Sequence, residues 1–96
     1  MNQAEQKQQA KPIEQAQLVT LLGLNLVDAF RLVETQEGVF ELQVLDTQGN
    51  ALVLATKRAS SAARQFKKAE AAFGFIKSHW NRSVPPQITV LLRTAT

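Results

Sequence analysis

Residues 39–45 constrain the fold more than any other segment, because apolar and polar side chains alternate along them. The alternating residues are Phe40, Glu41, Leu42, Gln43 and Val44. Successive side chains of a strand point to opposite faces of a sheet, so this order places the apolar set on one face and the polar set on the other. The segment therefore predicts a β-strand that packs on a core through one face only.

Glycine-containing turns flank this strand on both sides. One turn ends at Gly38, and the other contains Gly49 and Asn50, residue types that tolerate a positive φ angle. The apolar-rich residues 30–35 lie before the first turn, and residues 51–56 follow the second. Short turns of this kind join neighbouring antiparallel strands. We therefore predict a meander of three antiparallel strands.

Residues 24–35 fit two structures. Apolar side chains between Leu26 and Val33 follow a helical spacing, and they also alternate as in a strand that Asp28 interrupts. The hairpin that follows favours a strand for residues 30–35. The first half of the segment stays open between helix and strand.

A short helix is expected before this segment. Pro12 suits the first position of a helix, and Leu18, Leu21 and Leu22 would then lie on one face. Gly23 would end the helix. Residues 1–11 are polar and rich in glutamine, so they bury too little apolar surface to order, and we expect a disordered tail.

A longer apolar stripe follows the meander and predicts a long helix that covers the sheet. Its residues recur at spacings of three and four: Ala62, Phe66, Ala69, Phe73, Ile76 and Trp80. Ser60 or Ser61 would cap this helix; alternatively it begins near Lys67 or Lys68, with Phe66 as an anchor ahead of it. Pro85 and Pro86 lie beyond its end.

Two phenylalanines of this stripe region lead to specific expectations. Phe73 lies on the stripe, so Phe73→Ala should cost about 3–5 kcal/mol of stability. Phe75 lies off the stripe and is either a second core contact, which we favour, or an exposed anchor.

The last strand is expected over residues 87–93, which are rich in β-branched side chains. Because residues 88–92 are apolar at four of five positions, this strand is either central in the sheet or pairs across a dimer. The whole chain then forms one α+β domain over residues 12–96, in which a three- to four-stranded antiparallel sheet is covered by one long helix.

Several kinds of site are not expected in this chain. It has no cysteine and one histidine, His79, and its four glycines are scattered, so we expect no metal, no cofactor, no small-molecule substrate and no enzymatic activity. The longest apolar stretch is interrupted by polar residues, so no membrane span is expected. The glutamine-rich start of mixed charge does not resemble an export signal, and we expect a cytoplasmic protein.

Charge divides the chain into two unlike parts. Residues 1–56 contain three basic and seven acidic residues, for a net charge of −4. Residues 57–96 contain eight basic residues and one acidic residue, Glu70, for a net charge of +7. The total of +3 therefore conceals a dipolar molecule, which favours a partner of opposite charge.

The basic half predicts nucleic-acid binding. Its candidate residues are Lys57, Arg58, Arg64, Lys67, Lys68, Lys77 and Arg82. Five phosphate contacts would give log K a slope of about −4.5 against log salt. The alternative is a protein-interaction or homodimerisation module that uses the last strand and the oppositely charged surfaces.

A pattern over residues 39–80 adds a resemblance. A hairpin is followed by Arg64, Phe66, Lys67, Glu70, Ala71, Ala72, Phe75, Ile76 and Lys77. This order resembles short hairpin-plus-helix proteins of bacterial plasmids and other mobile elements, which implies an accessory role in plasmid maintenance or transfer. The meander and helix are also similar to plant and integrase modules that read DNA with the sheet, but this chain has Glu41 and Gln43 where those carry basic residues.

Overall fold

The computed structural model describes residues 10–57 and 62–93, and it contains a five-stranded sheet and two helices. In chain order the elements are β1 (Lys11–Ile13), α2 (Gln15–Gly23), β2 (Val27–Gln36), β3 (Val39–Asp46), β4 (Ala51–Leu54), α3 (Ala69–His79) and β5 (Ile88–Leu91). Neither helix is long and apolar enough to cross a membrane within these ranges.

The sheet has the strand order β1-β4-β3-β2-β5 and is mixed. Strands β2, β3 and β4 form the predicted antiparallel meander, with Gly38 and Gly49 at positive φ in its two turns. The expectation of a purely antiparallel sheet is wrong, because β1 pairs parallel to β4 and β5 pairs parallel to β2. Parallel strands cannot be joined by a short turn, so the crossover from β1 to β2 runs through α2 and that from β4 to β5 runs through α3.

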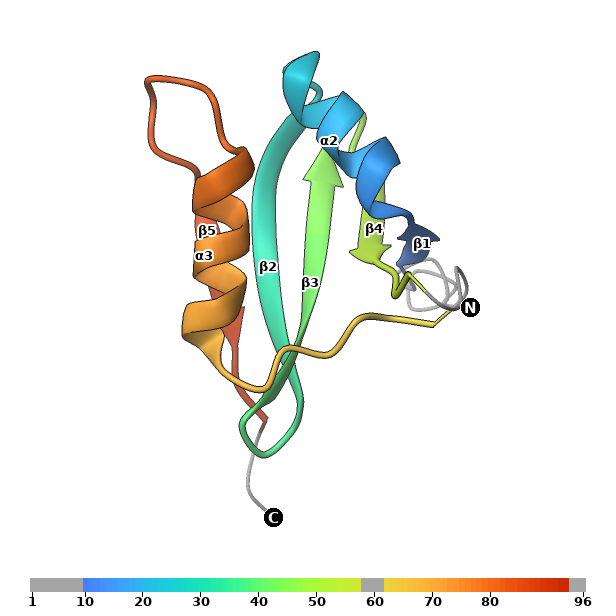
Figure 1. Cartoon of the computed structure of the whole chain (residues 1–96), viewed down its shortest axis with the longest axis vertical. Coiled ribbons are helices and arrows are strands. Elements are labelled where there is room, and N and C mark those ends of the chain that lie inside the picture. Colours follow the sequence, from blue (N-terminus) through green and yellow to red (C-terminus); the bar gives the residue numbers. More distant parts are fainter. Residues whose placement is uncertain (1–9, 58–61, 94–96) are drawn as a thin grey trace, which may run out of the picture.

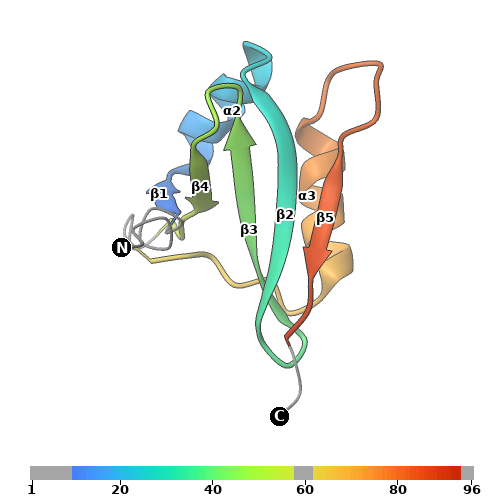
Figure 2. The same ribbon diagram turned by 180° about the vertical axis from the view of Figure 1, so that it is seen from behind.

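Both helices lie on the same face of the sheet (Figure 1), and the view from behind shows the opposite face uncovered by helices (Figure 2). The core fills the space between the helices and the sheet. Its largest fully buried side chains are Leu18 of α2, Phe30 and Leu32 of β2, Leu42 of β3, Leu54 of β4 and Ile76 of α3. Burial of one sheet face by helices explains the alternation that the meander strands show.

The start of the domain differs from the prediction. Lys11–Ile13 form the edge strand β1, so Pro12 belongs to a strand and not to the first turn of a helix. Proline lacks a backbone donor and is tolerated at sheet edges. Helix α2 begins after Glu14, whose backbone N–H donates to the Gln17 side chain at 3.1 Å in a capping box. The short N-terminal helix itself is confirmed.

The prediction of a long helix over residues 62–80 is wrong, because α3 has 11 residues and begins at Ala69. The preceding segment is extended and pairs with the meander through single bridges, Phe40 with Phe66 and Ala55 with Ala63. Phe66 is 4% exposed, which confirms it as the anchor ahead of a later helix start. The proposed caps Ser60 and Ser61 lie outside the described residues.

Residues 24–35, which the sequence left undecided between helix and strand, are mostly strand. Val27–Gln36 form β2, which includes the expected residues 30–35 and extends the strand toward its N-terminus. Asn25 has a φ of 58° in the turn between α2 and β2, so the helix cannot continue through it. Asp28 is exposed beside a register shift in the β2–β3 ladder, which explains how a strand accommodates it.

The stripe residues of α3 are not equally buried, which gives a first prediction. Ile76 is 1% exposed and Phe73 is 39% exposed. Ile76→Ala should therefore lower the unfolding free energy by about 2–5 kcal/mol, whereas Phe73→Ala should lower it by about 1 kcal/mol. This corrects the larger loss expected for Phe73 from the sequence. Urea unfolding of both variants measures the difference, and equal losses would contradict it.

The carboxylate of Glu34, near the end of β2, bonds to two other parts of the chain: the turn between β2 and β3, and the residues that follow β5. It accepts hydrogen bonds from the backbone N–H of Gly38 at 2.7 Å and from the backbone N–H of Arg93 at 2.9 Å. These interactions hold the pKa of the Glu34 carboxyl below its usual value of 4.5. The hydrogen bond from Gly38 has the largest effect, followed by the hydrogen bond from Arg93, and the positive charge of Arg93 adds a smaller one. The chain after β5 is thus attached to β2 through an ionised side chain.

This lowered pKa gives a second prediction. A carboxyl whose pKa is lower in the folded state stabilises the fold above its unfolded pKa, and this contribution is lost as pH falls through the folded pKa. Glu34→Gln should therefore be less stable than the wild type at neutral pH, with the gap narrowing below about pH 4.5. Urea midpoints across the acidic range measure the gap, and a gap independent of pH would contradict the assignment.

Candidate functional site

The described residues among the seven predicted to bind nucleic acid lie in different parts of the structure. Lys57 and Arg64 line one pocket, and Lys67 and Lys68 directly precede α3. Lys77 and Arg82 lie at the other end of α3, and Lys77 lines a separate groove. Arg58 lies outside the described residues.

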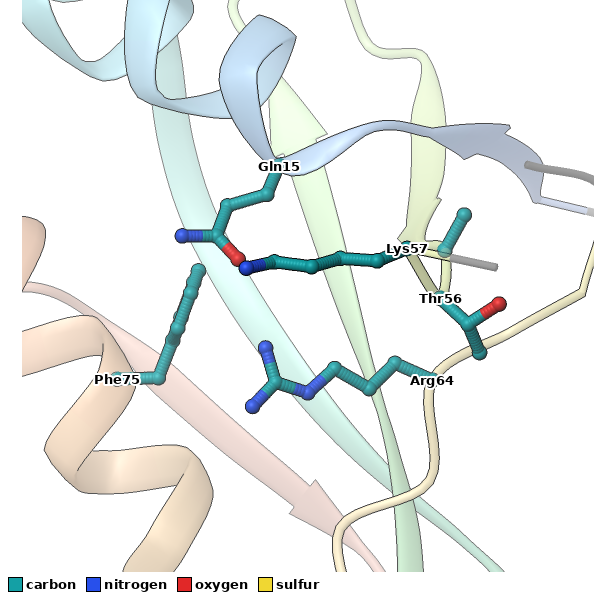
Figure 3. A pocket seen from close by; sticks show the side chains of 6 residues that line it. Gln15, Thr56, Lys57, Arg64 and Phe75 are labelled. Atoms are coloured by element: carbon teal, nitrogen blue, oxygen red, sulfur yellow. The ribbon is translucent and has the colours of Figure 1, made fainter. Parts of the chain in front are cut away.

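The pocket shared by Lys57 and Arg64 lies between the start of α2, the end of β4 and the inner side of α3 (Figure 3). It has a volume of about 480 Å³ and is lined by Gln15, Ala55, Thr56, Lys57, Arg64 and Phe75. In Figure 3 the long side chains of both cations extend toward Gln15 and Phe75. We call this site the basic pocket. It joins two positive charges, a side-chain amide and an aromatic ring.

Backbone pairing places Arg64 in this pocket. The Arg64 N–H donates to the Leu54 carbonyl at 2.8 Å, so the segment before α3 runs against the end of β4. The guanidinium then lies 4.7 Å from the ring centre of Phe66 and 5.6 Å from that of Phe75. Both distances are within the range of a cation–π interaction, which holds the guanidinium over the rings.

The described residues that line the basic pocket include no carboxylate. Glu14 lines a neighbouring hollow with Lys57, and its carboxylate accepts a hydrogen bond from the Gln17 backbone in the capping box of α2. Two positive charges directed into one pocket repel each other unless an anion lies between them.

Lys67 and Lys68 occupy an electrostatically unfavourable position. Lys68 is the N-cap residue of α3, and its side chain makes no capping hydrogen bond. The N-terminus of a helix carries partial positive charge, so a cation there lowers stability and an acidic side chain raises it. Both lysines are exposed, and they follow Arg64 by three and four residues along the same segment of chain.

The far end of α3 has a different character. The Arg82 guanidinium lies 5.1 Å from the ring centre of Trp80, and its Nη1 donates to the Val27 carbonyl at 3.4 Å. Lys77 lines an apolar groove together with Phe73 and Trp80. These two cations therefore lie outside the basic pocket, at a different surface of α3 and the loop that follows it.

The sheet face opposite to the helices does not offer a basic surface. Arg31 of β2 pairs with Gln43 of β3, and Glu41 lies two residues before Gln43 on the same face. The Arg31 Nε is buried and has no hydrogen-bond partner among the residues described. A face of such mixed charge gives no support to reading DNA with the sheet, as the sequence already indicated.

Sequence reasoning identified the cations but missed Gln15 and Thr56 as their neighbours. These two residues come from α2 and the end of β4, and no local spacing connects them to Arg64. Phe75 is half-buried and contacts Phe66 and His79 with ring centres 6.3 and 4.5 Å apart, which supports the core interpretation while its edge reaches the pocket.

Metal ligation finds no support in the described part of the chain, where no group of three or more His, Cys, Asp and Glu side chains could hold an ion. Comparison of the chain with protein-family models, curated proteins and solved structures gives no match.

The basic pocket gives a third prediction. An anion that binds only the folded state raises the unfolding free energy, by about 1.4 kcal/mol at about ten times its Kd. Pyrophosphate at constant ionic strength should therefore raise the melting temperature of the wild type, and Lys57→Gln should remove most of the increase. Lys77→Gln is the matched control, since it removes one exposed charge elsewhere. Equal increases in both variants would mean that the pocket is not the site.

Proposed function

We propose that the protein binds nucleic acid through the segment from Lys57 to Lys68. The observation that supports this most directly is the convergence of Lys57 and Arg64 on one pocket whose described lining residues include no carboxylate. Phosphates are the anions that such a pair would neutralise. The seven candidates are thereby reduced to four described residues: Lys57, Arg64, Lys67 and Lys68.

The aromatic ring in the pocket favours a single strand. Phe75 lines the same pocket as the two cations, so a base could take the place of the Arg64 guanidinium on its ring while neighbouring phosphates contact Lys57 and Arg64. Stacking on a ring requires an unpaired base, which a duplex does not offer. Four phosphate contacts with a single strand give log K a slope of about −2.8 against log salt.

The position of Lys67 and Lys68 supports a functional role for them. A cation at the N-terminus of α3 opposes the helix dipole, so these lysines do not serve stability. Residues that lower stability at such a position are typical of binding surfaces. A DNA-associated accessory role in a plasmid or mobile element, as the resemblance implies, would suit a small basic domain of this kind.

A fourth prediction separates binding from folding. Lys67→Glu with Lys68→Glu should abolish binding of a fluorescent oligothymidine at low salt. The same double variant should be as stable as the wild type, or more stable by about 0.5 kcal/mol, because acidic residues suit a helix N-terminus. Fluorescence anisotropy measures the binding, and urea unfolding measures the stability.

The control must change the net charge equally. Lys11→Glu with Lys77→Glu also replaces two exposed lysines, one in β1 and one at the far end of α3. This control should retain most of the binding. If both double variants lose it alike, the protein is responding to net charge alone, and the proposed site is wrong.

A further inference from the structure

Among residues 10–57 and 62–93, strand β5 has a partner on one side only. It is the last strand in the order of the sheet and pairs there with β2. Phe30 N–H donates to the Gln87 carbonyl at 2.9 Å, and Arg93 N–H donates to the Glu34 carboxylate at 2.9 Å, so residues 87 and 93 both face β2. Backbone groups of alternate residues in a strand point the same way. The N–H and C=O groups of Ile88, Val90 and Leu92 therefore point away from the sheet.

This free edge lacks the features that usually protect one. Val90 is 41% exposed, Leu91 44% and Leu92 67%. No charged residue, proline or bulge lies between Ile88 and Leu92. Proteins commonly use such features to prevent pairing with another chain. The edge is therefore open to a further strand.

An apolar groove lies beside this edge on the side of the sheet that the helices cover. It has a volume of about 430 Å³ and is lined by Phe73, Ile76, Lys77, Trp80, Pro86 and Ile88. Ile88 pairs with Phe30 of β2 and Val90 with Leu32, both buried under the helices, so these β5 side chains share that face. An added strand would direct every second side chain into the groove.

The far wall of the groove is fixed in place. Trp80 Nε1 donates to the Val84 carbonyl at 2.7 Å, which holds the loop after α3 against the indole. The Trp80 ring also makes an edge contact with Phe30, with ring centres 5.8 Å apart. A groove that is formed before binding loses less entropy when a ligand enters.

We propose that β5 binds an extended segment of a partner protein by strand addition, with apolar side chains in this groove and a carboxylate beside Lys77. Strand addition combines backbone hydrogen bonds along an edge with pockets for alternate side chains. The cations at the groove, Lys77 in its lining and Arg82 on the Trp80 ring, select an acidic segment. This surface is separate from the basic pocket and goes beyond nucleic-acid binding.

Two other occupants fit less well. A second copy that paired β5 with β5 about a two-fold axis would bring the groove cations of both copies to one interface, where the described groove residues include no acid. The chain's own residues 1–9 contain only Met1 and Ala4 as apolar residues, so they cannot supply alternating apolar side chains.

Amide NMR with a designed probe tests the proposal. The probe is a peptide of about eight residues that alternates valine and threonine and has one central glutamate. At millimolar concentration it should shift the amides of Ile88, Val90 and Leu92 and the Trp80 indole. The same peptide with alternate backbone amides methylated should not bind, because it cannot pair with an edge. Absence of these shifts, or equal binding of the methylated peptide, overturns the proposal.

Two variants assign the contacts. Val90→Pro removes an outward N–H and should abolish binding at little cost to the fold, whereas Leu91→Pro removes a bond to β2 and should lower the melting temperature. Lys77→Glu leaves the backbone of the β5 edge unchanged. It should weaken the binding of the glutamate peptide about threefold and strengthen the binding of the same peptide with lysine in place of glutamate. If Lys77→Glu changes neither affinity, the carboxylate site is wrong.

Sedimentation and the double lysine variant complete the test. A concentration-dependent dimer that Val90→Pro abolishes would mean that a second copy occupies the edge, and the partner proposal would be wrong. Lys67→Glu with Lys68→Glu should leave peptide binding unchanged. Loss of nucleic-acid binding in that variant, together with retained peptide binding, would support two independent surfaces.

Discussion

The antiparallel strand β3 links the two halves of the fold. Strands β1, β2, β4 and β5 all run in one direction, and β3 runs against them at the centre of the sheet. Helix α2 connects β1 to β2, and α3 connects β4 to β5. Each connection is therefore a parallel strand–helix–strand unit that crosses from one side of β3 to the other. Phe40, Leu42 and Val44 of β3 are buried beneath the helices, so both units share one core through this strand.

Local patterns in the sequence predicted those parts of the fold that depend on neighbours along the chain. The alternation around Leu42 and the turns at Gly38 and Gly49 specified the meander. The three-residue strand β1 has no such signal, because its partner β4 lies about forty residues further along and Pro12 suggests a helix start. The start of α3 was ambiguous for another reason: Phe66 is buried by its bridge to Phe40, yet it falls at a helical spacing from Ala69.

The candidate site shows the same division between local and distant information. Counting residues located the excess of positive charge in the second half of the chain. Only the fold shows that Arg64 and Lys57 enter one pocket while Lys77 borders an apolar groove at the other end of α3. The two surfaces use different sides of α3, since Phe75 lines the pocket whereas Phe73, Ile76 and Lys77 line the groove. The charge of the whole half therefore does not describe either surface.

The connectivity of β5 also has a consequence for the order of folding. The β2–β3–β4 meander pairs residues that are close along the chain, so its loops close at a small entropic cost. Strand β5 pairs with β2 only after a loop of more than fifty residues has closed, as Phe30 meets Ile88. We therefore expect β5 to join the sheet last and to separate from it first. A ligand that pairs with its outer edge would then stabilise the last step of folding.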